Sequence, residues 1–170
     1  MHTGEIELLL ARYFSYQQNI IVPNISYGLN LHEVDLLVIK QSHYAIEIEI
    51  KISVADLKAD LKKPHGHRSN KIKLLYFAVP SEIKDKALEL IPERAGLLTI
   101  THDIAKRSNG HFSNRYYVSA IKAPIVNKLA RKLTDKEISK VYELASMRIW
   151  NLKEIIYRLR KDNHERINNR

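Results

Sequence analysis

Hydrophobic and polar positions along the chain predict a succession of short helices and strands. Residues 5–14, 54–63 and 82–91 have the three- and four-residue spacing of helices. Runs with strand character follow at residues 19–26, 34–39, 44–52, 73–79, 97–101 and 116–121. Pro23 interrupts the first of these runs, which is typical of an edge strand. Strands mixed with helices at this spacing favour an α/β fold or an α+β sandwich.

The region after Pro124 has a different pattern. Thr134 and Glu137 form a capping box, which is a good helix start. Beyond it, apolar residues recur in steps of four and three, like the seam of a coiled coil. The seam consists of Ile138, Tyr142, Ala145, Ile149, Leu152, Ile156 and Leu159. We expect residues 134–161 either to pack on their own domain or to form a homodimer.

Composition narrows the class of protein. The chain has 170 residues, 45% of them hydrophobic and 28% charged, as in a soluble globular domain. Its lack of cysteine excludes disulfides, cysteine-ligated zinc and thiol nucleophiles. There is no N-terminal signal pattern and no apolar run long enough for a membrane span. We therefore expect a cytoplasmic protein that does not enter a membrane.

Positive charge is concentrated near the C-terminus. Of the formal net charge of +9, residues 1–121 contribute little, because 15 basic residues stand against 13 acidic ones. Residues 122–170 carry 13 basic and 6 acidic residues. We expect residues 1–121 to form the main domain and residues 122–170 a basic helical extension. Such a surface attracts nucleic acid, although basic helices also solubilise proteins.

Two neighbouring strands carry the residues with the clearest chemistry. In residues 44–52, Glu47, Glu49 and Lys51 alternate with isoleucines, so the three charged side chains share one face. At the start of the preceding strand, Glu33 and Asp35 also share a face. Alternating Glu and Lys are common on a solvated strand face as well, and Glu47 fits that interpretation best, as a solvated or supporting carboxylate.

The short segment between the strands predicts how they pair. If residues 41–43 form the turn of a hairpin, Asp35 lies directly across from Glu49, and Glu33 across from Lys51. Like charges at that distance must share a proton, gain a cation or bind a metal. Mg²⁺ suits the last option, because it takes one or two carboxylates and meets substrate phosphates. Lys51 would then stand beside the attacking water or the phosphate.

These residues resemble a known family. Glu33-Val-Asp35 followed by Glu49-Ile-Lys51 resembles the PD-(D/E)XK nuclease superfamily, which includes restriction enzymes, Holliday-junction resolvases and repair nucleases. Residues 49–64 and 73–79 look more specifically like the MmcB-type DNA-repair branch, with its E-x-K-S-S strand end and D-F-x-x-D-x-K-W-P helix. Ile52 stands where the branch favours Ser, and Lys63 where it favours Trp.

The resemblance implies a restriction-endonuclease-like fold, with a mixed central sheet flanked by helices. It implies that Asp35 and Glu49 bind Mg²⁺ or Mn²⁺, that the carbonyl of Ile50 is a further ligand, and that Lys51 is the catalytic lysine. Glu33 would support this site. We expect Glu5 either to complete the site from the first helix or only to favour the first turn of that helix.

Basic residues that follow the metal strand are expected along a phosphate path. They are Lys62, Lys63, His65, His67 and Arg68, joined in the C-terminal extension by Arg158, Arg160 and Lys161. The pair His65 and His67 is weak evidence for zinc, because no second pair of ligands accompanies it. The leading hypothesis is a metal-dependent nuclease that acts on DNA in repair, recombination or mobile-element biology. The alternatives are a catalytically silent DNA-binding protein of the same fold and an interaction protein that uses its C-terminal helix.

Overall fold

The computed structural model describes residues 2–25, 28–63, 66–106 and 112–168. The chain divides into two compact units, Met1–Leu133 and Thr134–Arg170. Residues 122–133 thus belong to the same unit as the sheet. No helix in the described part of the chain is both long and apolar enough to cross a bilayer.

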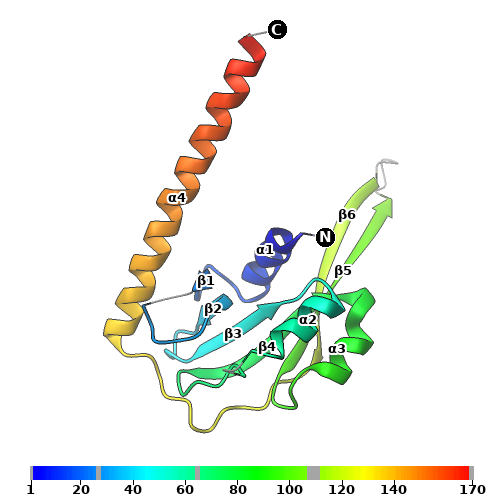
Figure 1. The fold of residues 1–170 in the computed structure, drawn as a ribbon, viewed down its shortest axis with the longest axis vertical. Helices are drawn as coiled ribbons and strands as arrows, with labels where there is room; N and C mark the ends of the chain where they lie inside the picture. The colour runs from blue at the N-terminus through cyan, green and yellow to red at the C-terminus, as the bar shows by residue number, and fades with distance from the viewer. Residues whose placement is uncertain (1, 26–27, 64–65, 107–111, 169–170) are drawn as a thin grey trace. The chain divides into compact units, whose positions relative to one another are not determined.

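The first unit contains one six-stranded sheet and the helices that cover it (Figure 1). In chain order its elements are α1 (Thr3–Tyr13), β1 (Ile20–Ile25), β2 (Val34–Ile39), β3 (Ala45–Ile50), α2 (Val54–Asp60), β4 (Ile72–Pro80), η1 (Ser81–Ile83), α3 (Lys84–Leu90), β5 (Gly96–Lys106) and β6 (Phe112–Lys122). The strands lie in the sheet in the order in which they occur in the sequence.

The sheet is mixed, and its connections follow from the strand directions. The pairs β1–β2, β2–β3 and β5–β6 are antiparallel, whereas β4 is parallel to both of its neighbours, β3 and β5. Parallel neighbours need a crossover connection, and helices α2 and α3 provide the two crossovers. The expected α+β sandwich with a mixed central sheet is confirmed, and it is consistent with a restriction-endonuclease-like fold.

Each face of the sheet has its own apolar core. Ile6 and Leu10 of α1 pack on one face with the side chains of Ile46, Ile48 and Ile50. On the other face, residues of α2 and α3 pack on β4 and β5, in a second cluster. That cluster contains Leu57, Leu75, Phe77, Val79, Ala87, Ile91, Ala95 and Leu97. The charged face of β3 lies on the same side of the sheet as this second cluster, because successive side chains alternate.

Two strands are longer than the sequence predicts. The pair β5–β6 continues beyond the neighbouring strands as a two-stranded arm (Figure 1). At the other end of β5, Gly96 is required by close packing, because a Cβ there would lie 2.7 Å from the ring of Tyr76 and 2.9 Å from the carbonyl oxygen of Lys122. The sequence does not predict the outer part of the arm, because side chains such as Ile104 are exposed and no burial pattern marks it.

The second unit is one long helix, α4 (Asp135–Asn168). Its predicted capping box is confirmed: Glu137 N–H donates to Thr134 Oγ1, and Thr134 N–H donates to Glu137 Oε2. Most of the predicted seam is exposed, with relative exposures of 46–58% at the following residues: Tyr142, Ile149, Leu152, Ile156 and Leu159. This apolar stripe therefore has no covering layer within the described residues.

Candidate active site

The hairpin of β2 and β3 has the predicted register. Leu36 pairs with Ile48, so the next opposed pair is Asp35 and Glu49, as expected. A backbone hydrogen bond of 3.0 Å from Lys40 N to Tyr44 O closes the turn. The short turn fixes the register, and the register brings the two carboxylates to the same face.

Lys51 joins three carboxylates. Its Nζ lies 2.8 Å from Glu49 Oε2, 3.1 Å from Asp35 Oδ2 and 3.1 Å from Asp60 Oδ1. Asp35 Oδ2 also accepts a hydrogen bond of 2.8 Å from the backbone N–H of Ile50. Since one nitrogen contacts both Asp35 and Glu49, their carboxylates are close enough to share one cation. Lys51 and Glu49 are buried, whereas the Asp35 side chain is 28% exposed and forms the open side of the cluster.

His67 extends the cluster on its buried side. Its Nδ1 lies 2.6 Å from Glu47 Oε1, and its Nε2 lies 2.7 Å from Asp60 Oδ2. His32 Nε2 contacts the same oxygen of Glu47 at 2.6 Å. A carboxylate can only accept from an imidazole nitrogen, so the imidazolium form of His67, with a proton on each nitrogen, satisfies both contacts. His67 thereby ties β3 to the end of α2.

Helix α2 brings Asp60 to the site. The helix starts directly after Lys51, where Ser53 caps it by accepting a hydrogen bond of 3.1 Å from Asp56 N–H. It buries Leu57 and, one turn later, Asp60. Residues three apart share a helix face, so the apolar contact of Leu57 orients the carboxylate of Asp60 toward β3. Lys63 then contacts Asp60 Oδ1 at 2.7 Å from outside the cluster.

The backbone that carries His67 is unusual. Gly66 and His67 both have left-handed conformations, with φ of 51° and 56°. Such a φ is uncommon for a residue with a side chain and favours glycine. Arg94 Nη2 donates to the carbonyls of both residues, at 3.1 Å for Gly66. Arg94 and the two carboxylates that hold the ring thus stabilise a turn that directs His67 inward.

The pKa values of both central residues are raised, which favours a neutral Glu49 but a charged Lys51. Burial and the nearby charge of Asp35 raise the pKa of Glu49 to about 7, against the effect of Lys51. Burial opposes the charge of Lys51, but the carboxylates of Glu49, Asp35 and Asp60 outweigh it and raise the pKa of the ammonium. Lys51 is therefore charged at neutral pH, and Glu49 is close to the point at which it takes up a proton.

The outer pair of carboxylates remains ionised. Burial opposes their charge, but hydrogen bonds from His67 and Lys63 lower the pKa of Asp60, and those from His32 and His67 lower the pKa of Glu47. Burial also disfavours a charged His67, yet its hydrogen bonds to Asp60 and Glu47 raise its pKa to about 9. At neutral pH Asp60, Glu47 and His67 are therefore all ionised.

Some oxygen atoms of this network are not satisfied. Among the described residues, Glu47 Oε2 and Glu49 Oε1 are buried and accept no hydrogen bond. Asp60 Oδ1 also lacks good hydrogen-bond geometry, although it lies within ion-pair distance of Lys51 and Lys63. Buried polar atoms without a partner are rare and indicate an absent ion, water or ligand.

The donor sets could hold a metal ion. Ligand atoms of Glu49, Asp60 and His67 lie within 4.8 Å of one another, and the same is true of His32, Glu47 and His67. Carboxylate oxygens suit hard cations such as Mg²⁺. His67 could join them as a ligand only after losing a proton, because a protonated ring nitrogen has no lone pair for a metal. The buried groups therefore fit a metal ion.

Glu33 and Glu5 are not part of the cluster. Glu33 is exposed just before β2, and the ammonium of Lys51 contacts other carboxylates. Glu5 is exposed in the first turn of α1, where it accepts a hydrogen bond of 2.8 Å from His2 N–H. The buried side chains of α1 pack on the opposite face of the sheet. Of the two roles expected for Glu5, only the one at the helix terminus matches its contacts.

Only some of the basic residues predicted along a phosphate path are exposed on the surface. Lys62 and Arg68 are exposed, and Lys63 is half-buried against Asp60. His67 is buried inside the cluster, so the expectation that it contacts phosphate is wrong. His65 lies outside the described residues. In the second unit, Arg158, Arg160 and Lys161 are exposed, and Arg158 contacts Glu154 at 2.5 Å.

Sequence reasoning missed two members of the cluster and left the role of a third open. Glu47 has 0% exposure, so its interpretation as a solvated carboxylate is wrong, whereas that as a supporting carboxylate agrees with its contacts to His32 and His67. Asp60 belongs to the D-x-x-x-D-x-K pattern of residues 56–62, which was a usable signal for a site residue. His32 had no such signal, because its partner lies 15 residues away on another strand.

The comparisons with known proteins agree with this geometry. A family model for MmcB-like DNA repair proteins matches residues 11–153. Among solved structures, a protein of unknown function from Silicibacter pomeroyi is similar, with a TM-score of 0.61 and 18% identity over 91% of this chain and 92% of the other. That likeness shows the fold alone. No curated protein gives a significant match. Since the matched residues span most of the sheet and the whole cluster, the chain belongs to the MmcB-like family of DNA repair proteins.

Proposed function

We propose that the protein is a Mg²⁺-dependent nuclease of the PD-(D/E)XK type that hydrolyses phosphodiester bonds in DNA. The observation that supports this most strongly is the meeting of Asp35, Glu49 and Lys51 at the ends of two paired strands. A merely structural salt bridge would satisfy its carboxylates, whereas Glu49 Oε1 is buried without a hydrogen bond from the described residues. The membership in a DNA repair family agrees with DNA as the substrate.

Asp35 and Glu49 would hold the metal ion, with the carbonyl of Ile50 as a third donor. Bound there, Mg²⁺ or Mn²⁺ would lower the pKa of a coordinated water and neutralise charge on the phosphate. Water attacks the phosphorus, the bond to the leaving oxygen breaks, and that oxygen takes up a proton. The partly exposed carboxylate of Asp35 is the side from which the strand approaches.

Lys51 would stabilise the negative charge that develops on the phosphate oxygens. Its raised pKa keeps it charged throughout the working pH range. Asp60 and His67 act as positioning residues: Asp60 contacts the ammonium of Lys51, and His67 holds Asp60. Preorganised charge of this kind contributes typically about 10²- to 10³-fold to a reaction rate for each group.

The test is a cleavage panel with the purified full-length protein. Linear, nicked, branched and single-stranded DNA are incubated with Mg²⁺, with Mn²⁺ or with EDTA. We expect cleavage of at least one substrate with either metal and none with EDTA. Asp35→Asn and Glu49→Gln keep the shape of each side chain, and both should reduce the rate by at least about 100-fold.

The matched control is Glu33→Gln, a neighbouring carboxylate that is exposed and outside the cluster. It should cleave like the wild type. Cleavage that survives in Asp35→Asn and Glu49→Gln would contradict this site. A folded wild-type protein that binds DNA but cuts no substrate in the panel would instead favour the catalytically silent DNA-binding protein.

We further propose that α4 mediates a homodimer and contributes basic contacts to DNA. The exposed stripe of Ile149, Leu152, Ile156 and Leu159 supports the dimer, because heptad-spaced apolar residues pair helices. Leu152→Glu with Ile156→Glu should give a monomer by light scattering. Charge reversal at Arg158, Arg160 and Lys161 should weaken DNA binding and flatten its salt dependence. An unchanged mass in the first variant would contradict the homodimer. An unchanged salt slope in the second would contradict the DNA contacts.

A further inference from the structure

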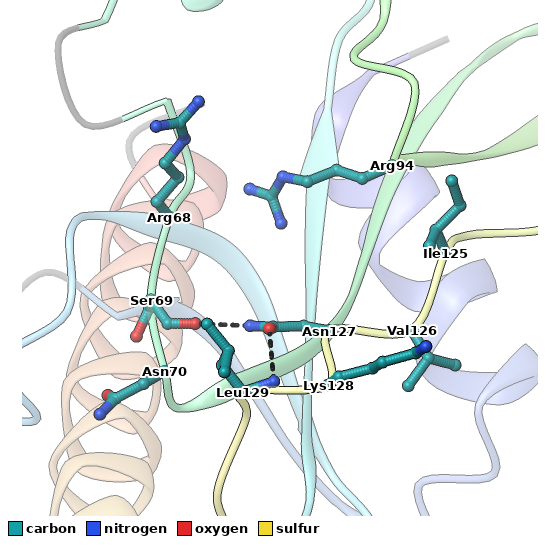
Figure 2. A pocket seen from close by; sticks show the side chains of 9 residues that line it. All are labelled: Arg68, Ser69, Asn70, Arg94, Ile125, Val126, Asn127, Lys128 and Leu129. Carbon is teal, nitrogen blue, oxygen red and sulfur yellow. Dashed lines mark hydrogen bonds between the residues drawn. The ribbon is translucent and has the colours of Figure 1, made fainter.

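A pocket with a volume of about 530 Å³ lies within the first unit, next to the turn that carries His67 (Figure 2). Segment 68–70, the residue Arg94 and the segment 125–129 form its walls. Its lining combines basic and apolar side chains: Arg68, Arg94, Lys128, Ile125, Val126 and Leu129. None of the cluster carboxylates lines it, so the pocket is separate from the site described above.

Hydrogen bonds fix the walls of the pocket. Asn127 Nδ2 donates to the carbonyls of Ser69 and Ile72, at 3.0 Å in each case, and Asn127 Oδ1 accepts from the N–H of Leu129 at 3.1 Å (Figure 2). The N–H of Ile125 donates to the carbonyl of Arg94 at 2.9 Å. The segment after β6 is thus held against the chain before β4, and the pocket is preformed.

Positive charge in the pocket is not neutralised from within. Of the described residues that line it, none is acidic. Arg68 and Lys128 form no ion pair with any residue that the structure describes. Arg94 Nη2 donates hydrogen bonds to two backbone carbonyls, those of Gly66 and His67. Burial lowers the pKa of Arg94, the charge of Glu47 outside the pocket opposes that shift, and the neighbouring charge of Arg68 adds to it. Like charges held together in a pocket favour an anion as the ligand.

The segment 125–129 also supplies apolar side chains to the pocket. Ile125, Val126 and Leu129 are all exposed, and Leu129 reaches 85%. Inorganic phosphate would leave these apolar side chains exposed to water, whereas the sugar and base of a nucleotide would cover them. The volume suits a ligand of nucleotide size, since small-molecule pockets span about 300–1,000 Å³. In a duplex the base points to the helix axis, so only an unpaired nucleotide can enter a concave pocket.

We infer that this pocket binds one nucleotide of an unpaired DNA strand, with its phosphate at Arg68 and Lys128 and its sugar and base against Leu129. The inference rests on the proposal that DNA is the substrate. Arg94 connects the pocket to the active site, because it donates to the carbonyl of His67, whose ring contacts Asp60. A nucleotide in the pocket would anchor the strand on the His67 side of the cluster, and it would favour substrates that contain single-stranded segments.

The test measures binding without catalysis. Fluorescence anisotropy in EDTA compares a single-stranded oligonucleotide with its duplex, using the full chain. Arg68→Gln with Lys128→Gln should weaken single-strand binding at least about tenfold, and the loss of one phosphate contact should reduce the salt slope by about 0.7. The matched control, Arg12→Gln with Lys86→Gln, removes the same charge from exposed positions outside the pocket and should stay within about twofold of the wild type.

A second variant tests the apolar wall. Leu129→Ser should weaken binding of the ordinary single strand about three- to tenfold, but should leave an otherwise identical abasic strand unchanged, because a base is then no longer there to pack. Equal losses in the pocket variant and its control would overturn the inference. So would equal losses on single strand and duplex, or displacement by poly-glutamate at the same charge concentration. The nuclease proposal has a separate readout, since it fails only if the wild type does not cut DNA.

Discussion

Strand β3 is buried on both faces, but different interactions hold the two faces. Ile46, Ile48 and Ile50 pack on the apolar side chains of α1 and of neighbouring strands. On the reverse face, Glu47 and Glu49 are equally buried and are held by ion pairs and hydrogen bonds. The same six residues therefore present a conventional core on one side and a charged network on the other.

The two faces differ in what they tolerate. Apolar burial is roughly proportional to the area removed from water and is insensitive to pH and to added cations. A buried ion network repays the desolvation of its charges only when every member is present, and removing one leaves another uncompensated. The charged face is therefore expected to be the less stable one and to respond more strongly to pH and cations, as the proposed binding of a cation and an anionic substrate requires.

The largest effect is expected from Lys51→Ala. It removes the partner of three carboxylates, so it should lower the free energy of unfolding in EDTA by about 3–5 kcal/mol. It should also reduce cleavage by at least about 100-fold. Urea denaturation with and without Mg²⁺ is the measurement, and Mg²⁺ should stabilise the variant more than the wild type, because it replaces the missing charge.

Lys51→Met is the control, since it keeps the aliphatic stem and removes only the charge. It should behave like Lys51→Ala in cleavage and respond in the same way to Mg²⁺. If either variant is as stable as the wild type in EDTA, Lys51 does not hold the charged face together.

Ile48→Ala tests the opposite face of the same strand. Ile48 is fully buried, so the truncation should lower the free energy of unfolding by about 2–5 kcal/mol. The loss should be the same at pH 6 and pH 9 and with or without Mg²⁺. Denaturation across these conditions checks it, and a loss that depends on metal or pH would remove the distinction between the faces.

The pH dependence of stability should report on His67. Its pKa is raised from 6.5 to about 9 in the folded protein, so folding favours the protonated form. This stabilisation is fully present below pH 6.5 and is lost as the pH rises through about 9. In EDTA, the wild type should lose on the order of 2–3 kcal/mol over that window. His67→Gln should flatten the curve.

Glu49 provides an internal control for that experiment. Its pKa is raised from 4.5 to about 7, so its contribution favours low pH too, but it is lost in a lower window. Glu49→Gln should remove the decline between pH 4.5 and 7 and leave that between 7 and 9. If His67→Gln keeps the decline at alkaline pH, the imidazolium is not part of the network.

The smallest effect is expected from Glu5→Gln. Glu5 accepts a hydrogen bond from the backbone of His2 at the start of α1, the helix that covers the apolar face. The variant should lose at most about 1 kcal/mol of stability, as for other helix caps, and should cut DNA like the wild type. If the variant instead lost most of its cleavage activity at normal stability, Glu5 would contribute to the proposed metal site after all.

The sequence predicts the fold well where interactions are local. The register of the β2–β3 hairpin follows from a short turn and the alternation of side chains, and the start of α4 follows from its capping box. The full length of β5 and β6 could not be predicted from the sequence, because the outer residues of these strands pair with each other but are not buried in the core. Pairing between exposed strands leaves little trace in a hydrophobic pattern.

The site was predictable only in part, for a related reason. Asp35 and Glu49 face each other across a single hairpin, so their pairing could be predicted from the length of the turn between the two strands. The burial of Glu47 could not, because an alternating Glu-Lys strand looks the same whether its polar face meets water or another layer. That layer is supplied by Asp60 and His67, which reach the face only after the chain has crossed over the sheet.

That crossover has a consequence for how the protein folds. The hairpin of β2 and β3 can form early, since its contacts are close in sequence, whereas the parallel pairing of β3 with β4 must wait for loop closure. His67 lies between α2 and β4 in the sequence. Its contacts with Glu47 and Asp60 therefore stabilise this crossover once the loop has closed. Amide hydrogens of β3 and β4 should then exchange through one shared opening event, and a bound cation should slow that event more than the opening of the β5–β6 arm.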